Sequence, residues 1–513
     1  MKNSSFLRGS SHRQRGVVVL AMFIVLMTGS LYLLTAHLAR ATQHAPMQQE
    51  AQTRRVLTEA KNALITFAAM NRNRPGGLPC PDRNGDGESE LSCDHPADRV
   101  GFLPWQTLAT DDLRDVSGAR LWYVVSAAYR NDANNIINPT TLGDLSIAAD
   151  GVAVARHNDL AAAVIAPGAA SVGQSRAGSV ARADYIESVV GANLNEINRT
   201  RSNDRIDTVS AAELWASVER VVAERIEHDI APLIESSYVQ LWRRLPFSAP
   251  FNDPAQARTI TAIDEPRSEG TLPGPEEAAN VAWDRASIAV SDAGGGGALL
   301  AADCRRSIAT EIRCDLHYRA PLRIRIDARA LYAGRALVTP PSVVRGDFAP
   351  ATLGMPSIEA RPPTADGHAM ITAWASLPLV GNMLRVSLHA PTPIRALVDR
   401  RIPVAEPHSW FARNEWFKFI VLATTPSLLP GPARPACTLT GNCLRIANSA
   451  RHPAVPGLII FTGRARVDAR AAAIDRYLEG DNAQVDDQQF DARPNNSNDR
   501  VTPLCASGCG GVL

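Results

Sequence analysis

A long uncharged run near the amino terminus limits what this chain can become. Val17 to Ala36 (VVVLAMFIVLMTGSLYLLTA) contain no charged residue, and about 20 apolar residues are enough for a helix to cross the hydrocarbon core of a bilayer. The residues before the run include no acid, and four of them are basic: Lys2, Arg8, Arg13 and Arg15. Because positive flanks stay on the cytoplasmic side, we expect a basic leader over 1–16 with a cytoplasmic amino terminus, followed by a transmembrane helix over 17–37.

A cleaved secretory signal is the alternative interpretation of the same run. Such signals have an apolar core of about 7–15 residues and a cleavage site made of small residues. The uncharged run is longer than that core, and the stretch T-A-H-L-A-R-A from Thr35 matches such a site only weakly. The length therefore favours a helix that is retained.

The cysteines indicate an oxidising compartment. An even number of cysteines in tight pairs is typical of disulfides formed outside the cytosol. A zinc site built from the last four is the alternative, but their C-x5-C and C-x3-C spacings differ from the usual C-x2-C pattern. Other connectivities stay open from spacing alone. We predict four bonds between near neighbours: Cys80–Cys93, Cys304–Cys314, Cys437–Cys443 and Cys505–Cys509.

Composition narrows the class of protein further. The 513 residues leave room for two to four domains at about 150 residues each. Lys and Arg number 53 against 52 for Asp and Glu, which gives a net charge of +1. A general nucleic-acid binder usually shows a basic excess, so we expect no nucleic-acid partner.

The start of the apolar run resembles a known processing site. R-Q-R-G followed by V-V-V-L-A-M-F-I-V-L is similar to the prepilin-type cleavage site of type IV pilins and type II secretion pseudopilins. The resemblance implies that a prepilin peptidase cuts between Gly16 and Val17, that the new amino terminus is methylated, and that the helix is kept. Most members carry a glutamate where this chain has Ala21, which shifts the expectation from a major to a minor or tip subunit.

The same architecture implies a helical stem after the membrane helix, over 38–72. In QQEAQTRRVLTEAKNALITFAAM, which begins at Gln48, apolar residues recur at helical spacing. Pro46 would kink or break the helix between membrane and stem. The predicted apolar face contains Val56, Ala60, Ala63, Leu64, Phe67 and Ala68.

Further motifs extend the resemblance along the chain. They are LPCPD-R-NGDG, GFLPWQTL, DLRD and RLWYVVS within 73–130, WFARNEWF near 410–417, IIFTGRA at 459–465, DRYLEGDNA at 475–483 and NDRV at 498–501. Together they resemble large bacterial proteins described as prepilin-type cleavage/methylation-domain or type II secretion system proteins. That group implies a single-pass inner-membrane protein with a periplasmic head, and it supplies no enzyme activity.

One of these motifs has the spacing of a calcium loop. D-R-N-G-D-G from Asp82 matches D-x-[DN]-x-[DN]-G, in which alternating oxygen side chains converge on one hard cation. The twelfth position is Cys93 instead of a bidentate glutamate, so an EF-hand is not expected. A shortened loop closed by the Cys80–Cys93 bond would bind calcium, and an Asx-turn without metal is the alternative. The candidate ligands are Asp82, Asn84, Asp86, Glu88 and Glu90.

The remaining pattern predicts an α+β fold. An Ala-, Asn- and Asp-rich stretch over 131–300 suggests an inserted helical subdomain. Its clearest helix starts at the S-A-A-E capping box of Ser210, Pro232 would bend or end that helix, and Gly294–Gly297 would form a linker. Over 301–513 apolar residues alternate with polar ones around Ile324 and Val386, and apolar runs lie at 419–423 and 458–462. This part should be a mostly antiparallel, disulfide-stapled β-domain.

Three functional hypotheses follow. The first is a non-enzymatic pilin-like protein whose partners are the inner membrane, the prepilin peptidase and other pilin or pseudopilin subunits. The second is an anchored periplasmic protein that binds glycan or another envelope ligand. The third is an anchored hydrolase that uses paired carboxylates of the tail, namely Asp475, Glu479, Asp481, Asp486 and Asp487. Neither H-E-x-x-H nor G-x-S-x-G occurs in the chain, and we favour the first hypothesis.

Overall fold

The structure is a computed structural model. It describes residues 13–132, 135–148, 159–191, 193–198, 203–240, 245, 248, 251, 268–272, 281–308, 311–319, 322–332, 345–349, 357–360, 369–377, 383–389, 410–428, 437, 441–465, 474–484, 487–492 and 498–504.

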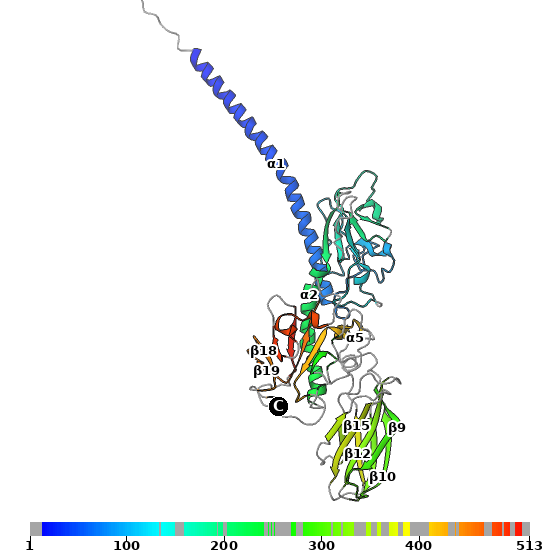
Figure 1. The fold of residues 1–513 in the computed structure, drawn as a ribbon. Coiled ribbons are helices and arrows are strands. Elements are labelled where there is room, and N and C mark those ends of the chain that lie inside the picture. The colour runs from blue at the N-terminus through cyan, green and yellow to red at the C-terminus, as the bar shows by residue number, and fades with distance from the viewer. Residues whose placement is uncertain are drawn as a thin grey trace, which may run out of the picture.

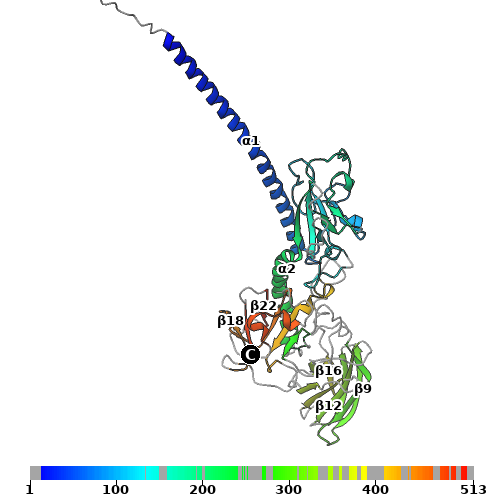
Figure 2. The same ribbon diagram turned by 45° about the horizontal axis from the view of Figure 1, so that its top comes forward.

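One long helix projects from a head that has three parts (Figures 1 and 2). The first part surrounds the end of the helix, the second lies around the far end of α2, and the third is a β-sandwich at the opposite end of the molecule from the free end of the helix. The projecting helix is α1 (Arg13–Met70), a single element of 58 residues. It continues through Pro46, contrary to the expected break. A proline removes one N–H from the helical ladder, and here the turns on both sides remain helical.

The carboxyl-terminal part of α1 packs on the head. Leu57, Ala60, Leu64 and Ala68 are buried at intervals of three and four residues, which places them on one helix face. This face contacts α2 (Ala211–Arg225), β4 (Leu160–Ala166) and β7 (Arg205–Ser210). The other members of the predicted face, Val56, Ala63 and Phe67, are half-buried against the same core.

A sheet forms the first part of the head, and two of its four strands, β4 and β7, lie within 131–300, which the sequence assigns to a helical subdomain. Its order is β1-β2-β4-β7, all antiparallel, with β1 at Val100–Phe102 and β2 at Trp122–Val125. A smaller sheet joins β3 (Ser146–Ala148), β6 (Glu196–Asn198) and β5 (Val189–Val190). Short 3-10 turns occupy the connections: η1 (Pro96–Arg99), η2 (Ala127–Tyr129) and η3 (Arg182–Asp184).

Apart from the 3-10 turn η3, helices within 131–300 are confined, among the described residues, to a region beginning at Ala211. The predicted capping box is present: the Ser210 side chain accepts from the Glu213 N–H, and the Glu213 side chain accepts from the Ser210 N–H. α2 continues through the π-helical turn η4 (Ile226–Ile230), α3 (Ala231–Ile234) and the π-helical turn η5 (Glu235–Gln240). Pro232 does not end the helical region. The wider turn η4 precedes it, and such bulges relieve constraints on the i→i−4 ladder.

The second part of the head is built from chain segments far apart in sequence. Its sheet has the order β22-β20-β17-β8, with β8 at Glu269–Thr271, β17 at Ile420–Thr424, β20 at Gly457–Phe461 and β22 at Arg500–Pro503. A three-stranded sheet contains β18 (Leu444–Ala447), β19 (Ala454–Val455) and β21 (Gln489–Asp491). The short helical elements are α5 (Trp410–Arg413), η7 (Trp416–Phe419), η8 (Ile474–Tyr477) and η9 (Gly480–Ala483).

The β-sandwich is inserted between β8 and β17, which are themselves paired neighbours. One sheet has the order β10-β11-β16-β13 and the other β14-β15-β12-β9. The strands are β9 (Val281–Asp292), β10 (Leu299–Ile308), β11 (Glu311–Tyr318), β12 (Leu322–Tyr332), β13 (Arg345–Ala349), β14 (Ser357–Ala360), β15 (Ala369–Leu377) and β16 (Met383–His389). Most of this inserted module lies within 301–513, where the sequence predicts β-structure; β9 and the first residues of β10 lie within 131–300, which the sequence assigns to a helical subdomain.

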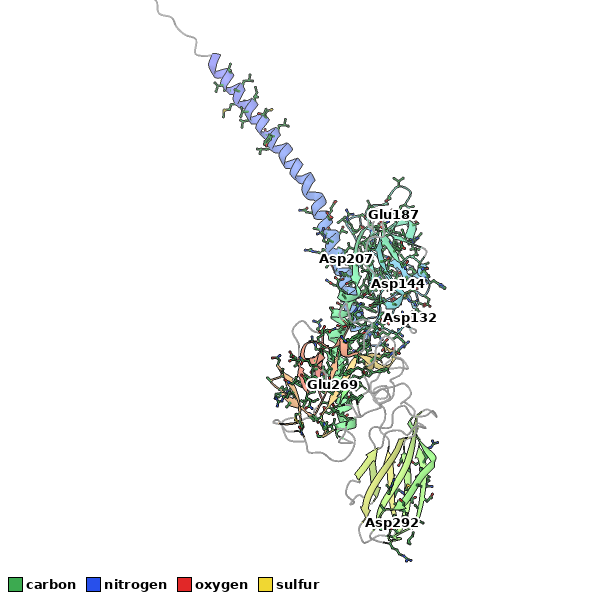
Figure 3. All side chains as sticks on the ribbon, in the orientation of Figure 1. Asp132, Asp144, Glu187, Asp207, Glu269 and Asp292 are labelled. Atoms are coloured by element: carbon green, nitrogen blue, oxygen red, sulfur yellow. A yellow bond between two sulfur atoms is a disulfide. The ribbon has the colours of Figure 1, made fainter. Side chains whose placement is uncertain are left out.

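The glycine run expected as a linker is instead a turn inside this sandwich. Gly294–Gly297 lie between β9 and β10, and the carboxylate of Asp292 accepts from the N–H groups of Gly294 and Ala298 at 2.8 and 3.0 Å. Figure 3 labels Asp292 at the tip of the sandwich. The turn joins the two sheets of one module and does not separate two domains.

The α+β class and the mostly antiparallel sheets agree with the sequence prediction. The strands β12, β16, β17 and β20 form where alternation and apolar runs predicted them. Within the described residues, no helix is both long enough and apolar enough to cross a membrane, so the transmembrane helix over 17–37 stays a prediction.

Candidate functional site

The amino-terminal part of α1 presents apolar side chains that the head does not cover. The described side chains of residues 17–33 are all exposed, and the large apolar ones, from Val17 at 68% to Leu33 at 62%, have more than half of their surface free. Figure 3 shows this part of the helix standing clear of the rest of the molecule. Contiguous exposed apolar surface on this scale marks a site of contact with a membrane or another protein.

Two of the three hydroxyl side chains in this apolar segment, those of Thr28 and Ser30, are bonded to the helix itself. Thr28 Oγ1 donates to the carbonyl of Ile24 at 2.7 Å, and Ser30 Oγ donates to that of Leu26 at 2.5 Å. Bonds of this kind remove the need for a water partner. These two polar groups are therefore satisfied within the helix.

A partly buried ion pair anchors the stem to the head. Lys61 Nζ lies 2.8 Å from Glu213 Oε1 and 3.6 Å from Asp207 Oδ1, and Figure 3 labels Asp207 beside α1. Burial alone would raise the pKa of Glu213, but hydrogen bonds from Lys61 and Ser210 outweigh burial and lower the pKa. Glu213 thus caps α2 and receives the only lysine of the stem at the same time.

The predicted cleavage residues both lie in the first turns of α1. Val17 is 68% exposed. Residues 1–12 of the leader lie outside the described residues.

The predicted calcium loop is arranged around its own N–H groups. The buried carboxylate of Asp82 accepts from Gly85 N at 2.6 Å and Gly87 N at 2.8 Å. Asp86 accepts from Asn84 Nδ2 and Glu88 N, both at 2.8 Å. Backbone donors aimed at these oxygens are the arrangement of an Asx-turn, the alternative without metal.

The rest of the proposed ligand set does not converge either. Glu90 Oε1 accepts from Arg83 N at 3.3 Å. Among the described residues no three acidic, histidine or cysteine side chains are grouped to hold a metal. Burial raises the pKa of Asp82, against the two backbone hydrogen bonds that lower it. Calcium binding stays a prediction that this loop geometry does not support.

Three predicted disulfides are present: Cys80–Cys93, Cys304–Cys314 and Cys437–Cys443. Cys80–Cys93 closes the loop of Asp82. Cys304 and Cys314 face each other in register on β10 and β11, as expected for a stapled hairpin. Cys505 and Cys509 lie outside the described residues.

A buried polar cluster at α2 joins the first and second parts of the head. Glu219, 8% exposed, accepts from Arg464 N at 2.5 Å and from Asn498 Nδ2 at 3.2 Å. Arg464 Nη2 donates to Asp159 Oδ2, just before β4, at 2.5 Å. Burial raises the pKa of Glu219 to about 7, with the hydrogen bonds from Asn498 and Arg464 acting in the opposite direction.

This cluster brings together residues of the motifs IIFTGRA, DRYLEGDNA and NDRV. Gly463 has φ +62°, and a Cβ there would lie 2.5 Å from Asn498 Nδ2, so the T-G-R segment leaves no room for a side chain. Glu479 Oε2 accepts from Asn498 N at 3.1 Å, and Glu479 N donates to Asp499 Oδ2 at 2.9 Å. Three carboxyl-terminal motifs therefore form one structural unit.

A second motif joins the parts of the head through Asn414 of WFARNEWF. Asn414 Oδ1 accepts from Ile137 N at 3.3 Å, and Asn414 Nδ2 donates to the carbonyl of Asn73 at 3.1 Å. Next to it, Trp410 and Trp416 are fully buried, and the guanidinium of Arg225 stacks 4.0 Å from the Trp410 ring centroid. These tryptophans belong to the core and do not line an exposed surface.

The carboxylates proposed for a hydrolase are placed differently from one another where the structure describes them. Glu479 is engaged with Asn498 in the buried cluster, whereas Asp481 and Asp487 are exposed. Asp486 lies outside the described residues, and the side chain of Asp475 is not described.

The sequence interpretation overlooked Glu219 and Asp159. Glu219 falls in the apolar stripe of α2 between Val218 and Val222, and an acid in such a stripe is the signal that could have identified it. Comparison with protein-family models, with curated proteins and with solved structures finds nothing that matches this chain.

Proposed function

We propose that this chain is a non-enzymatic, pilin-like inner-membrane protein with a periplasmic head, acting as a minor or tip subunit of a type IV pilus or type II secretion pseudopilus. The observation that carries the proposal is the division of α1. Its outer part exposes apolar side chains over 17–33, and its stem is built into the head. In this function the outer part lies in the inner membrane and then packs against the helices of neighbouring subunits.

The ends of the apolar segment support the orientation. The leader before Val17 is basic, which favours a cytoplasmic amino terminus. The cysteine pairs of the head are oxidised, as befits a domain on the periplasmic side. The internal hydrogen bonds of Thr28 and Ser30 suit an apolar surrounding in which unpaired polar groups are costly.

The shape of the head supports the terminal position. A repeating subunit must fit between identical neighbours on every side of the helical core. This head carries an inserted sandwich at the end far from the free end of α1 (Figure 1). Ala21 replaces the glutamate common in major subunits, which the resemblance links to minor or tip subunits.

Processing by prepilin peptidase is the decisive test. We expect the protein recovered from its native membrane to begin at methylated Val17, and to keep Met1 in cells that lack the peptidase. Substitution Gly16→Glu should give the uncleaved mass in normal cells. Gly29→Ala is the matched control, since a Cβ at Gly29 meets no atom within 4 Å, and that variant should be cleaved normally.

Retention of Met1 in normal cells would overturn the proposal and favour an anchored binding protein instead. Assembly is tested separately by affinity purification of the processed protein from membranes. We expect pilin-like subunits to be recovered with it and to be lost in Val25→Asp, because Val25 is 68% exposed in the apolar segment. Recovery unchanged by that substitution would contradict helix-mediated assembly.

A further inference from the structure

A cavity of about 590 Å³ opens on the first part of the head. Its walls come from the loop at Asn84–Gly85, the turn over 114–120 and the chain that follows β4 as far as Tyr185, and Phe102 of β1 adds to the lining. Ligand-binding pockets in proteins commonly have volumes of about 300–1,000 Å³. The cavity is therefore large enough for a small molecule.

Hydrogen bonds hold two of these walls together. The carbonyl of Gly168 accepts from Ser117 Oγ at 2.7 Å and from Arg176 Nη1 at 2.6 Å. The N–H of Gly168 donates to Asp115 Oδ2 at 2.7 Å. The turn and the loop are thus joined by hydrogen bonds of the chain itself, and a preformed cavity lowers the entropy cost of binding.

The charge of the lining is positive. It includes Arg114, Arg120 and Arg176 and contains no aspartate or glutamate. One carboxylate outside the lining, Asp112, contacts two of these arginines, at 2.5 Å from Arg114 Nη2 and 3.2 Å from Arg120 Nε. Asp82 and Glu187, also outside the lining, interact through space with Arg120 and Arg176, so the positive charge of the lining is partly balanced from behind its walls.

Arg176 is positioned by neutral acceptors. Its guanidinium donates to the carbonyls of Asp184 and Gly168 and to the side-chain oxygen of Gln174. It also lies 5.2 Å from the ring centroid of Tyr185. These contacts fix its direction, and the carboxylate of Glu187 interacts with its charge through space. Arg120 uses Nε and Nη1 on Asp112 and the carbonyl of Gly85, and its Nη2 donates to no described residue.

We propose that this cavity binds a small ligand through a carboxylate or phosphate group, held by Arg114, Arg120 and Arg176. Arginine forks match the geometry of both oxyanions. The neutral part of the ligand would rest on the small residues Ala169 and Ala170 at the rim. This binding site is separate from the exposed segment of α1 and does not depend on the assembly proposed above.

The test is isothermal titration calorimetry of the full chain in detergent at low ionic strength. The probes are inorganic phosphate, glucuronate and, as the neutral counterpart, glucose. We expect saturable binding of phosphate or glucuronate at one site, none of glucose, and an affinity that falls as salt is added. Preference for glucuronate would indicate an acidic sugar as the natural source, and preference for phosphate a phosphorylated one.

Two variants and a matched control define the site. Arg114→Gln should weaken binding by about tenfold through loss of a charge-assisted contact. Ala170→Trp should weaken it by filling the cavity, with all three charges kept. Arg83→Gln is the control: Arg83 is 45% exposed and paired with an aspartate, as Arg114 is at 47%, but it lies outside the lining. Absence of binding to both anions, or equal losses in Arg83→Gln and Arg114→Gln, would overturn the proposal.

Discussion

Both ends of α1 are rich in apolar residues, but the head buries only those near the carboxyl-terminal end of the helix. Between residues 57 and 68 the apolar side chains occupy one stripe and are buried by α2, β4 and β7. Between residues 17 and 33 they occupy every face and are exposed. An apolar stripe can be covered by one partner surface, whereas a helix that is apolar on every face must be surrounded by apolar groups. The stem therefore obtains its partner from its own head, and the outer segment requires one from elsewhere.

The largest expected effect breaks the stem side of this comparison. Leu64 is fully buried in the stem, so Leu64→Ala should lower the free energy of unfolding of the head by about 2–5 kcal/mol. Leu26→Ala removes the same atoms from a side chain that is 61% exposed and should leave that free energy unchanged. Denaturant titration of both variants in detergent measures the contrast. Equal losses would show that the two ends are not different environments.

A second prediction concerns Glu219 of α2, the helix against which the stem packs. Burial raises the pKa of Glu219 from 4.5 to about 7 in the folded protein. The folded state then holds a proton that the unfolded chain releases, so this group's contribution is complete below about pH 4.5 and is lost as the pH rises to 7. The expected loss is roughly 3 kcal/mol.

Unfolding measured at pH 5 and pH 8 should show this difference in the parent protein and a flatter profile in Glu219→Gln. Glu224→Gln serves as the control, because Glu224 is exposed on the same helix, and it should keep the parental profile. An unchanged slope in Glu219→Gln would assign the pH dependence to other groups.

The loop of Asp82 gives a smaller effect in the part of the head that receives the stem. Asp82→Asn replaces one of two acceptor oxygens that receive N–H groups, which should cost about 1–3 kcal/mol. Because these donors form an Asx-turn and no three candidate ligands are grouped among the described residues, adding calcium or a chelator should not shift the melting temperature of the parent protein. A rise in melting temperature with calcium that is absent in Asp82→Asn would restore the calcium site.

The smallest expected effect comes from comparing two cations of the stem, one partly buried and one exposed. The Lys61 side chain is only 16% exposed between Glu213 and Asp207, so Lys61→Met should lower stability by about 1 kcal/mol, since its partners are partly solvated. Arg54→Met removes a cation that is 77% exposed and 3.8 Å from Glu50, and should have no measurable effect. Thermal unfolding of the two variants side by side decides between a buried and a surface role.

Local signals in the sequence were reliable where the fold depends on neighbours in the chain. The capping box at Ser210 and the alternation in β16 are of this kind. They failed at β4, whose sequence LAAAVIA is rich in the helix-forming residue alanine. Those alanines lie in a fully buried strand between β2 and β7, where small size suits the packing and tertiary context overrides propensity.

The candidate sites also differ in whether the local sequence could predict them. The Cys80–Cys93 and Cys304–Cys314 bonds could be predicted because each pair is close in sequence. The partners of Glu219 lie 245 and 279 residues away along the chain, so no local pattern could predict them. In the Asp82 loop the residue types were identified correctly, but their spacing does not reveal that backbone N–H groups occupy the oxygens.

The insertion point of the sandwich also determines how the head responds to force. The chain leaves β8 after Thr271 and returns to β17 at Ile420, and Thr271 pairs with Val421. Before β17, however, the returning chain passes through α5 and η7, whose Trp410 and Trp416 are fully buried. A pull on the sandwich would therefore load two unlike anchors: on the outgoing side the hydrogen bonds between β8 and β17, beginning with Leu272 N to the carbonyl of Ile420, and on the returning side the packed aromatic core.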